Sequence, residues 1–196
     1  ALEVIWIADN KTVLLRQTFN GYQNWFTITA DGKGTAKQIT KDKANNRDIT
    51  LNKTKTLAVY LSGRNELRLL DLKTLESKMI VKDEFWAIQN STPSFSLNDQ
   101  YVVFTAFRNF EQDILVHEIK TNKTINLTNT GVTETSPVWS PDGKYIYFTS
   151  ARTKPSYPSG MQDAHVYRMA LNNYDTPYRS DKFDELFKED KPAEPK

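Results

Sequence analysis

The chain has 196 residues, 38% of them hydrophobic and 12% aromatic, which is enough apolar material for one large domain or two small ones and argues against disorder. Its 26 basic and 24 acidic residues are spread along the chain and leave a net charge of +2, so we expect no nucleic-acid partner. The lack of cysteine excludes disulfides and cysteine-based metal sites, and no apolar run approaches the roughly 18 residues of a membrane span.

One sequence unit occurs four times: a large apolar residue followed, nine positions later, by the end of a short apolar run. The paired positions are Trp6 and Leu15, Leu51 and Tyr60, Phe95 and Phe104, and Trp139 and Phe148, so the period is 45, 44 and 44 residues. A polar turn separates anchor and run in each copy, at 8–11, 53–55, 97–100 and 141–144. A period of this size with no helical pattern inside it is typical of a β-propeller blade.

Each repeat is predicted to contain up to four strands. The apolar run is the second strand, and its lack of polar alternation predicts burial on both faces, as in a blade sandwiched between its neighbours. We expect third strands at 24–29, 66–72, 113–119 and 165–171. More polar fourth strands, suited to the outer edge, are expected at 36–40, 77–81 and 124–128.

The fourth repeat departs from this pattern. Its connection from second to third strand is long, 153–164, and no fourth strand is recognisable after Leu171. Residues Phe183, Leu186 and Phe187 have helical spacing within 180–188, and a charged linker follows at 189–196. We therefore expect fifteen strands, with the last blade completed by a strand from elsewhere.

The domain prediction is four propeller repeats in residues 1–172 and an exit segment, with a short helix and a linker, in 173–196. The repeats are placed at about 2–46, 47–92, 93–136 and 137–172. On this reading the chain is the C-terminal portion of a larger ring.

The stretch 136–152, Ser-Pro-Val-Trp-Ser-Pro-Asp-Gly-Lys-Tyr-Ile-Tyr-Phe-Thr-Ser-Ala-Arg, closely resembles the repeat of TolB-like propellers. It is equally similar to the propeller repeats of tricorn-type peptidases, and residues 93–99 match more loosely. Residues 176–184 resemble the segment that leaves the propeller in bacterial tricorn-like serine peptidases, where a charged linker leads towards the catalytic domains.

The resemblance implies an all-β, TolB-like β-propeller fragment, with about four blades of a ring of about six and an incomplete last blade. It implies a non-catalytic part of a serine peptidase that docks or filters peptide substrates or partner domains, because the family's catalytic Ser and His lie in later domains. The expected partners are a peptide or protein ligand and the remaining blades and catalytic domains of the parent chain. No cofactor is expected, and a bacterial periplasm or envelope is favoured over the cytoplasm.

Two other functions stay open: a TolB-type envelope module that binds a protein, and the propeller of a prolyl-oligopeptidase-like enzyme. The sequence after Lys196 distinguishes the three. A PDZ-like domain with a Ser/His peptidase core indicates the first, a terminus the second, and an α/β-hydrolase the third.

Three arginines, Arg64, Arg108 and Arg152, stand one period apart, each four residues past the end of its apolar run, where repeat one has Phe19. They are binding candidates, because a row of guanidinium groups on one rim attracts peptide carboxylates through bidentate pairs. The alternative is structural: each arginine bonds local carbonyls or an acid of the neighbouring blade.

The 153–164 insertion supplies two further binding candidates, Tyr157 and Met161, because function concentrates on such excursions, and His165 follows it as a third. A hydrolytic group of Ser159, Asp163 and His165 is disfavoured, since no Gly-x-Ser-x-Gly elbow occurs in the chain. The Asp and Asn turns are isolated pairs, so no metal site is predicted.

Overall fold

The computed structural model describes residues 3–86, 92–108, 110–155 and 163–172. These residues contain no helix and fifteen strands, the number that the repeats predict. The strands are β1 (Glu3–Trp6), β2 (Thr12–Phe19), β3 (Tyr22–Thr29), β4 (Lys37–Gln38), β5 (Asn46–Leu51), β6 (Leu57–Ser62), β7 (Glu66–Asp71), β8 (Ser77–Lys82), β9 (Ser94–Phe95), β10 (Tyr101–Arg108), β11 (Glu111–Glu118), β12 (Lys123–Asn126), β13 (Glu134–Trp139), β14 (Tyr145–Ser150) and β15 (His165–Ala170).

The strands form four antiparallel sheets, each a blade of the propeller and each made of strands consecutive in the chain. Blade 1 has the order β1-β2-β3-β4, blade 2 β5-β6-β7-β8, blade 3 β9-β10-β11-β12 and blade 4 β13-β14-β15. The four apolar anchors of the sequence repeat are the last residues of β1, β5, β9 and β13. The expected all-β propeller architecture is therefore confirmed, and the helix expected at 180–188 lies outside the described residues.

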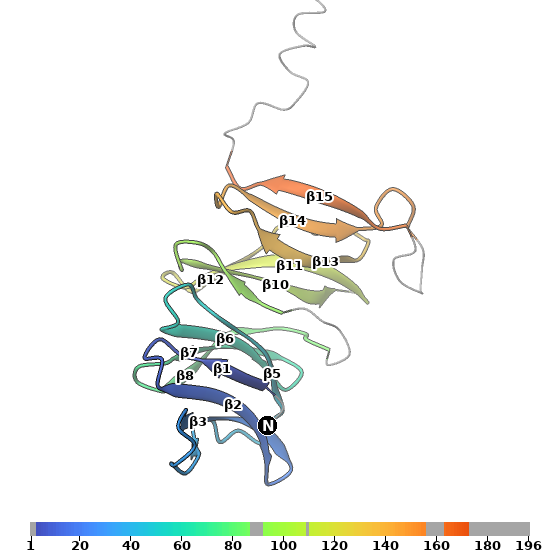
Figure 1. The fold of residues 1–196 in the computed structure, drawn as a ribbon. Coiled ribbons are helices and arrows are strands. Elements are labelled where there is room, and N and C mark those ends of the chain that lie inside the picture. The colour runs from blue at the N-terminus through green and yellow to red at the C-terminus, as the bar shows by residue number, and fades with distance from the viewer. Residues whose placement is uncertain (1–2, 87–91, 109, 156–162, 173–196) are drawn as a thin grey trace, which may run out of the picture.

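The blades stack face to face in chain order, with blades 1 and 4 at opposite ends of the row (Figure 1). A separate apolar cluster fills each junction. Trp25 and Tyr60 belong to the cluster between blades 1 and 2, Phe104 and Leu67 to that between blades 2 and 3, and Ile146 to that between blades 3 and 4. The propeller is therefore stabilised mainly by contacts between neighbouring blades, which bury apolar surface.

Burial of the second strands depends on the position of the blade in the row. In β6 and β10, of the middle blades, nearly every residue is buried, as expected for strands covered on both faces. In β14 buried and half-buried residues alternate, and β2 is buried only at Val13 and Leu14. The prediction of burial on both faces was therefore wrong for the end blades, because within the described residues each has a neighbouring blade on one side only.

The turn between first and second strands repeats its backbone geometry. Asn10, Lys55, Asp99 and Gly143 occupy the same turn position, and their φ angles are 53°, 54°, 57° and 70°. In blades 3 and 4 a serine precedes this turn, and Ser140 Oγ donates to Asp142 (2.5 Å) while accepting from the backbone N–H of Tyr145 (2.9 Å). The polar turns of the sequence repeat are thus tight turns that each contain one residue in the left-handed backbone conformation and are closed by side-chain hydrogen bonds.

Candidate functional site

The predicted arginines lie along one edge of the row of blades, which we call the hairpin rim. It consists of the loops that follow β2, β6, β10 and β14, together with the connections that follow β4, β8 and β12. All these loops emerge at the same edge because consecutive strands in each blade run antiparallel. Loops at one edge of a propeller lie side by side and can form one binding surface.

Arg64 is the exposed member of the three arginines. It stands in the loop after β6, and its side chain makes no hydrogen bond or ion pair with the part of the chain that the structure describes. Its guanidinium group therefore keeps all of its donors available to solvent or to a ligand.

Arg108 is held by an acid of the preceding blade. Its Nη1 and Nη2 lie 2.5 and 2.7 Å from the two carboxylate oxygens of Asp83, which follows β8, and Nη1 also donates to the carbonyl of Phe107 (2.7 Å). These hydrogen bonds to Asp83 raise the pKa of Arg108. The bidentate pair links blade 2 to blade 3 and occupies most of the guanidinium fork.

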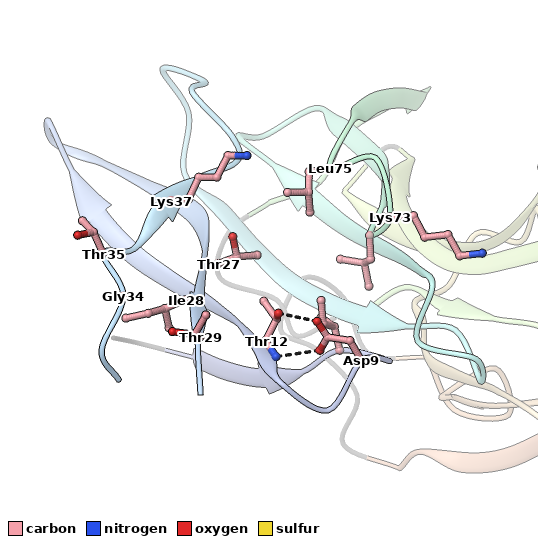
Figure 2. Close-up of a pocket in the computed structure, with 12 residues that line it drawn as sticks. Asp9, Thr12, Thr27, Ile28, Thr29, Gly34, Thr35, Lys37, Lys73 and Leu75 are labelled. Carbon is pink, nitrogen blue, oxygen red and sulfur yellow. Dashed lines mark hydrogen bonds between the residues drawn. The ribbon is translucent and has the colours of Figure 1, made fainter. Parts of the chain in front are cut away.

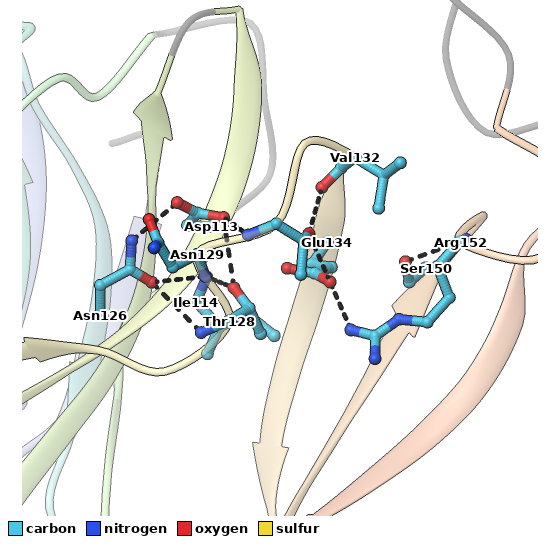
Figure 3. A network of polar contacts seen from close by, with 10 residues as sticks. Asp113, Ile114, Asn126, Thr128, Asn129, Val132, Glu134, Ser150 and Arg152 are labelled. Atoms are coloured by element: carbon cyan, nitrogen blue, oxygen red, sulfur yellow. Dashed lines mark hydrogen bonds and ion pairs between the residues drawn. The ribbon is translucent and has the colours of Figure 1, made fainter.

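Arg152 belongs to a polar network between blades 3 and 4 (Figure 3). It pairs with Glu134, the fully buried first residue of β13, and its guanidinium carbon lies 4.7 Å from the ring centre of Tyr167. Glu134 Oε1 also accepts from Thr130 Oγ1 (3.0 Å), whereas Glu134 Oε2 has no partner in the described residues. The pairing and the stacking fix Arg152 against its own blade.

Asp113 extends this network into blade 3. Its carboxylate accepts from Asn126 Nδ2 (2.7 Å), from Thr128 Oγ1 (3.3 Å) and from the backbone N–H of Thr130 (3.3 Å) (Figure 3). Because Thr130 bonds both Asp113 and Glu134, the connection between the two blades is held by two buried carboxylates. The sequence gives no sign of this network, since Asp113 and Glu134 are 21 residues apart and share no motif.

The other binding candidates of the sequence lie in and before β15 or outside the described residues. His165 is exposed and begins β15, opposite Ser150. Asp163 lies before the strand and pairs with Lys154 (2.8 Å), an exposed ion pair. Tyr157 and Met161 lie outside the described residues.

The rim also carries an aromatic cluster that the sequence repeat does not predict. Trp86 stacks on Phe107, with ring centres 4.4 Å apart and planes at 16°, and meets Phe110 edge-on at 6.4 Å. Phe107 is buried, whereas Phe110 is 72% exposed at the β10–β11 turn. Aromatic side chains next to the rim arginines were visible in the sequence, but the stacking depends on the approach of blade 2 to blade 3.

Grooves run between blades at the opposite edge of the row. Figure 2 shows the groove between blades 1 and 2, of about 340 Å³, where Thr12 donates to Asp9 through its backbone N–H (2.8 Å) and its hydroxyl (2.6 Å). These hydrogen bonds lower the pKa of Asp9. Equivalent grooves of about 670 and 530 Å³ lie between blades 2 and 3 and between blades 3 and 4. Thr and Lys make up half of the residues that line the groove between blades 1 and 2, and Val116, Ile125, Leu127 and Trp139 contribute apolar side chains to the groove between blades 3 and 4.

The described residues contain no group of three or more His, Cys, Asp or Glu side chains arranged to hold a metal ion. Within those same ranges, no helix has the length and apolar character needed to cross a membrane.

A family model for the TolB beta propeller domain matches residues 52–185, and the chain belongs to this family. No curated protein sequence matches the chain. Among solved structures it is similar to the tricorn protease, at 17% identity and a TM-score of 0.62, over 76% of this chain and 15% of that one.

A structure assigned as TolB from Agrobacterium tumefaciens is similar at 19% identity and a TM-score of 0.60, over 86% of this chain and 57% of that one. A prolyl endopeptidase is similar at 14% identity and a TM-score of 0.58, over 88% and 28%. The chain thus spans less than two thirds of the length of each of these proteins. The likenesses show a shared propeller fold.

Proposed function

We propose that this chain is a non-catalytic part of a larger TolB-like propeller in a tricorn-like serine peptidase, where it docks peptide substrates or partner domains. The observation that carries the proposal is the uncovered sheet face at each end of the row of blades.

On blade 1, Val4 and Trp6 point away from blade 2 and are 61% and 49% exposed, and Phe19 and Tyr22 lie on the same face. On blade 4, Val138 and Val166 are exposed on the face opposite to blade 3, at 54% and 70%. Soluble proteins rarely leave apolar patches of this kind on two separate faces. Both faces have the form of blade junctions, and further blades would cover them.

The proposed docking surface is the hairpin rim. Arg64, on blade 2, presents an unpaired guanidinium group. Phe110, on the neighbouring blade 3, has an exposed aromatic ring. A guanidinium group and an aromatic ring suit a peptide carboxylate and an apolar side chain. Arg108 and Arg152 act in this proposal as supports of the rim. His165 on blade 4 remains a candidate contact, as do Tyr157 and Met161, which lie outside the described residues.

The test of docking uses one peptide in two forms, with a free C-terminal carboxylate and with an amide. We expect the carboxylate form to bind more tightly, and Arg64→Ala to remove that difference, because only the charged group engages the guanidinium. Lys73→Ala, an exposed cation at the opposite edge, is the matched control and should leave the difference unchanged. Equal affinity of both forms for the unsubstituted chain contradicts rim docking.

Two measurements test the rest of the proposal. Peptide-cleavage assays of the purified chain should show no turnover, and measurable turnover contradicts a non-catalytic role. Light scattering should show a chain that associates or stays open, whereas a closed, stable monomer contradicts the idea of a partial ring.

A second candidate is a TolB-type envelope module that binds a protein and belongs to no enzyme. It is favoured by coverage, because the chain spans 57% of the Agrobacterium structure but only 15% of the tricorn protease. A bacterial envelope location accompanies this candidate. The propeller of a prolyl-oligopeptidase-like enzyme is the third, and the sequence that follows Lys196 separates all three.

A further inference from the structure

Three equivalent grooves lie between neighbouring blades, and the first of them has the most basic lining. It lies between blades 1 and 2, and its charged side chains are Lys37, Lys73 and Asp9. The groove between blades 2 and 3 instead has two acids, Asp71 and Glu76, and one lysine, and a single aspartate is the charged residue of the groove between blades 3 and 4. An anionic ligand would therefore favour the first groove over the other two.

Thr27, in β3, supplies this groove with a buried hydroxyl group. It lines the groove, is only 7% exposed, and its side chain makes no hydrogen bond with the residues that the structure describes. Leu69 and Val116 hold the equivalent positions in blades 2 and 3, each opposite the outer strand of its own blade. A buried hydroxyl without a partner destabilises a fold. A ligand that accepts its hydrogen bond explains this threonine better than packing does.

Two lysines approach the same groove from different blades. Lys37 lies directly opposite Thr27 in the pairing of β3 with β4, so both side chains are on the face of blade 1 that turns to blade 2. Lys73 comes from the turn after β7 in blade 2 (Figure 2). Neither ammonium group makes a hydrogen bond or an ion pair with the described part of the chain. Both charges are therefore available to a ligand.

Leu75 adds an apolar wall from an unusual backbone position. Its φ is 63°, and the equivalent turn residue of blade 3 is Asn122, with a φ of 54°. Asparagine adopts this left-handed conformation more readily than leucine does. Together with Leu72 and Ile7, Leu75 gives the groove an apolar side. Two residues that depart from the local preference, Thr27 and Leu75, thus line one groove, as is common at functional sites.

We propose that the groove between blades 1 and 2 binds a small phosphate monoester with a hydroxyl-bearing body, such as a sugar phosphate. A phosphate monoester carries a charge of about −2 near neutral pH, which matches two ammonium groups, whereas a carboxylate would match only one. Its oxygens accept from the two lysines and from the hydroxyl of Thr27. The volume of about 340 Å³ suits a ligand of this size.

The rest of the groove suits the body of such a ligand. The carboxylate of Asp9 accepts three hydrogen bonds, from Lys11 and Thr12, and has about four acceptor positions, so it can also accept from a ligand hydroxyl. The carbon atoms of the body would contact Leu72 and Leu75. The groove is at the opposite edge from the hairpin rim, so this inference is independent of peptide docking there.

The test is a titration of the purified chain with glucose 6-phosphate, glycerol 3-phosphate, glucose and inorganic phosphate, followed through the backbone amide signals in NMR spectra. We expect saturable shifts at Thr27, Lys37 and Leu75 with the monoesters. Glucose 6-phosphate should bind at least about tenfold more tightly than glucose or inorganic phosphate, because it alone of these three uses both parts of the groove. Equal affinity for either of these two, or no shift with either monoester, overturns the inference.

Two lysines at equivalent positions give a matched pair of variants. Lys37→Gln should weaken the binding of glucose 6-phosphate at least about tenfold, because it removes one of the two charges. Lys78→Gln changes the equivalent residue of blade 2, which lines the next groove, and should leave the affinity unchanged. An equal loss in both variants, or no loss in Lys37→Gln, contradicts a site between blades 1 and 2.

Thr27→Val tests the buried hydroxyl. It should weaken the binding of glucose 6-phosphate about five- to tenfold, because a hydrogen bond to a charged ligand is lost. It should not lower the midpoint of urea unfolding, since the other blades have apolar residues at this position. Unchanged affinity shows that the hydroxyl does not face the ligand and overturns the inference. If the variant proves unstable, Lys37→Gln at its exposed position still decides.

Discussion

At the scale of single residues, the repeat gives one position two different roles. Arg64 and Arg152 stand two periods apart, yet the first is solvent-exposed and the second pairs with the buried Glu134. The reason lies in the partner, because the residue equivalent to Glu134 in blade 2 is Asn46, which carries no charge. Asn46 is also fully buried, and it bonds Thr40 Oγ1 (3.0 Å).

This contrast predicts that substitution by alanine destabilises the protein at Arg152 but not at Arg64. Arg152→Ala leaves a fully buried carboxylate without its cation, and we expect it to lower the free energy of unfolding by about 2–4 kcal/mol. Arg64→Ala should change it by less than about 0.5 kcal/mol, as at an exposed site without partners. Urea unfolding followed by tryptophan fluorescence measures both. Similar changes in the free energy of unfolding for the two variants would show that the pair of Arg152 with Glu134 does not stabilise the fold.

His117 predicts a pH dependence of stability. It is fully buried between blades 2 and 3, its Nε2 has no partner in the described residues, and burial lowers its pKa, with Lys78 acting in the same direction and Glu118 against it. The unfolded chain therefore binds a proton at a higher pH than the folded one. Stability falls as the pH drops through the ordinary histidine range, about 6.5, towards the lower folded value.

We expect the midpoint of urea unfolding to decrease between pH 7 and pH 5, and His117→Leu to reduce that decrease. Leucine suits the site because Leu70 holds the equivalent position in blade 2. The exposed His165, changed to Asn, is the control and should keep the full decrease. An unchanged pH profile in His117→Leu would assign the effect to carboxylates.

At the scale of elements, the first turn of each blade is the most regular feature. In all four blades one residue of this turn adopts the left-handed backbone conformation. Only blade 4 has glycine at that position, whereas blade 2 has Lys55, at a φ of 54°. A residue with a Cβ in this conformation costs about 1–2 kcal/mol, and the greater freedom of glycine in the unfolded chain offsets part of the gain.

Lys55→Gly should accordingly raise the free energy of unfolding by about 0.5 kcal/mol. Gly143→Ala should lower it by about 1 kcal/mol, although a Cβ there meets only Leu97 at 3.5 Å. Lys53→Gly, two residues away in the same turn and without a positive φ, should give no gain. Thermal unfolding of the three variants measures these changes in stability. A loss of stability in Lys55→Gly would contradict the argument that the left-handed conformation favours glycine at this position.

At the scale of the whole molecule, the two end faces govern behaviour in solution. Trp6 on blade 1 and Val166 on blade 4 are exposed on surfaces built like blade junctions. We expect the isolated chain to associate as its concentration rises, and Trp6→Gln with Val166→Thr to reduce that association without lowering the melting temperature. Met79→Gln, on the outer strand β8 and similarly exposed, should leave association unchanged. Light scattering over a concentration series measures the association of each variant, and equal association of the double variant and the unsubstituted chain would contradict this prediction.

The sequence alone determined the blades. Period, anchors and polar turns are local features, and a strand of alternating or continuous apolar residues between turns has few other ways to fold. It also located the three arginines, whereas its expectation that no fourth strand follows Leu171 concerns residues outside those that the structure describes.

Only the tertiary structure decided what these residues contact. The pairing of Arg108 with Asp83 and of Arg152 with Glu134 joins residues 25 and 18 positions apart, and the stacking of Trp86 on Phe107 depends on the approach of two blades. The exposure of blades 1 and 4 depends on which sheet has a neighbour. The Arg152–Glu134 pair joins two elements of one blade, and the other two contacts join neighbouring blades. Neither kind of contact follows from the period that predicts each blade.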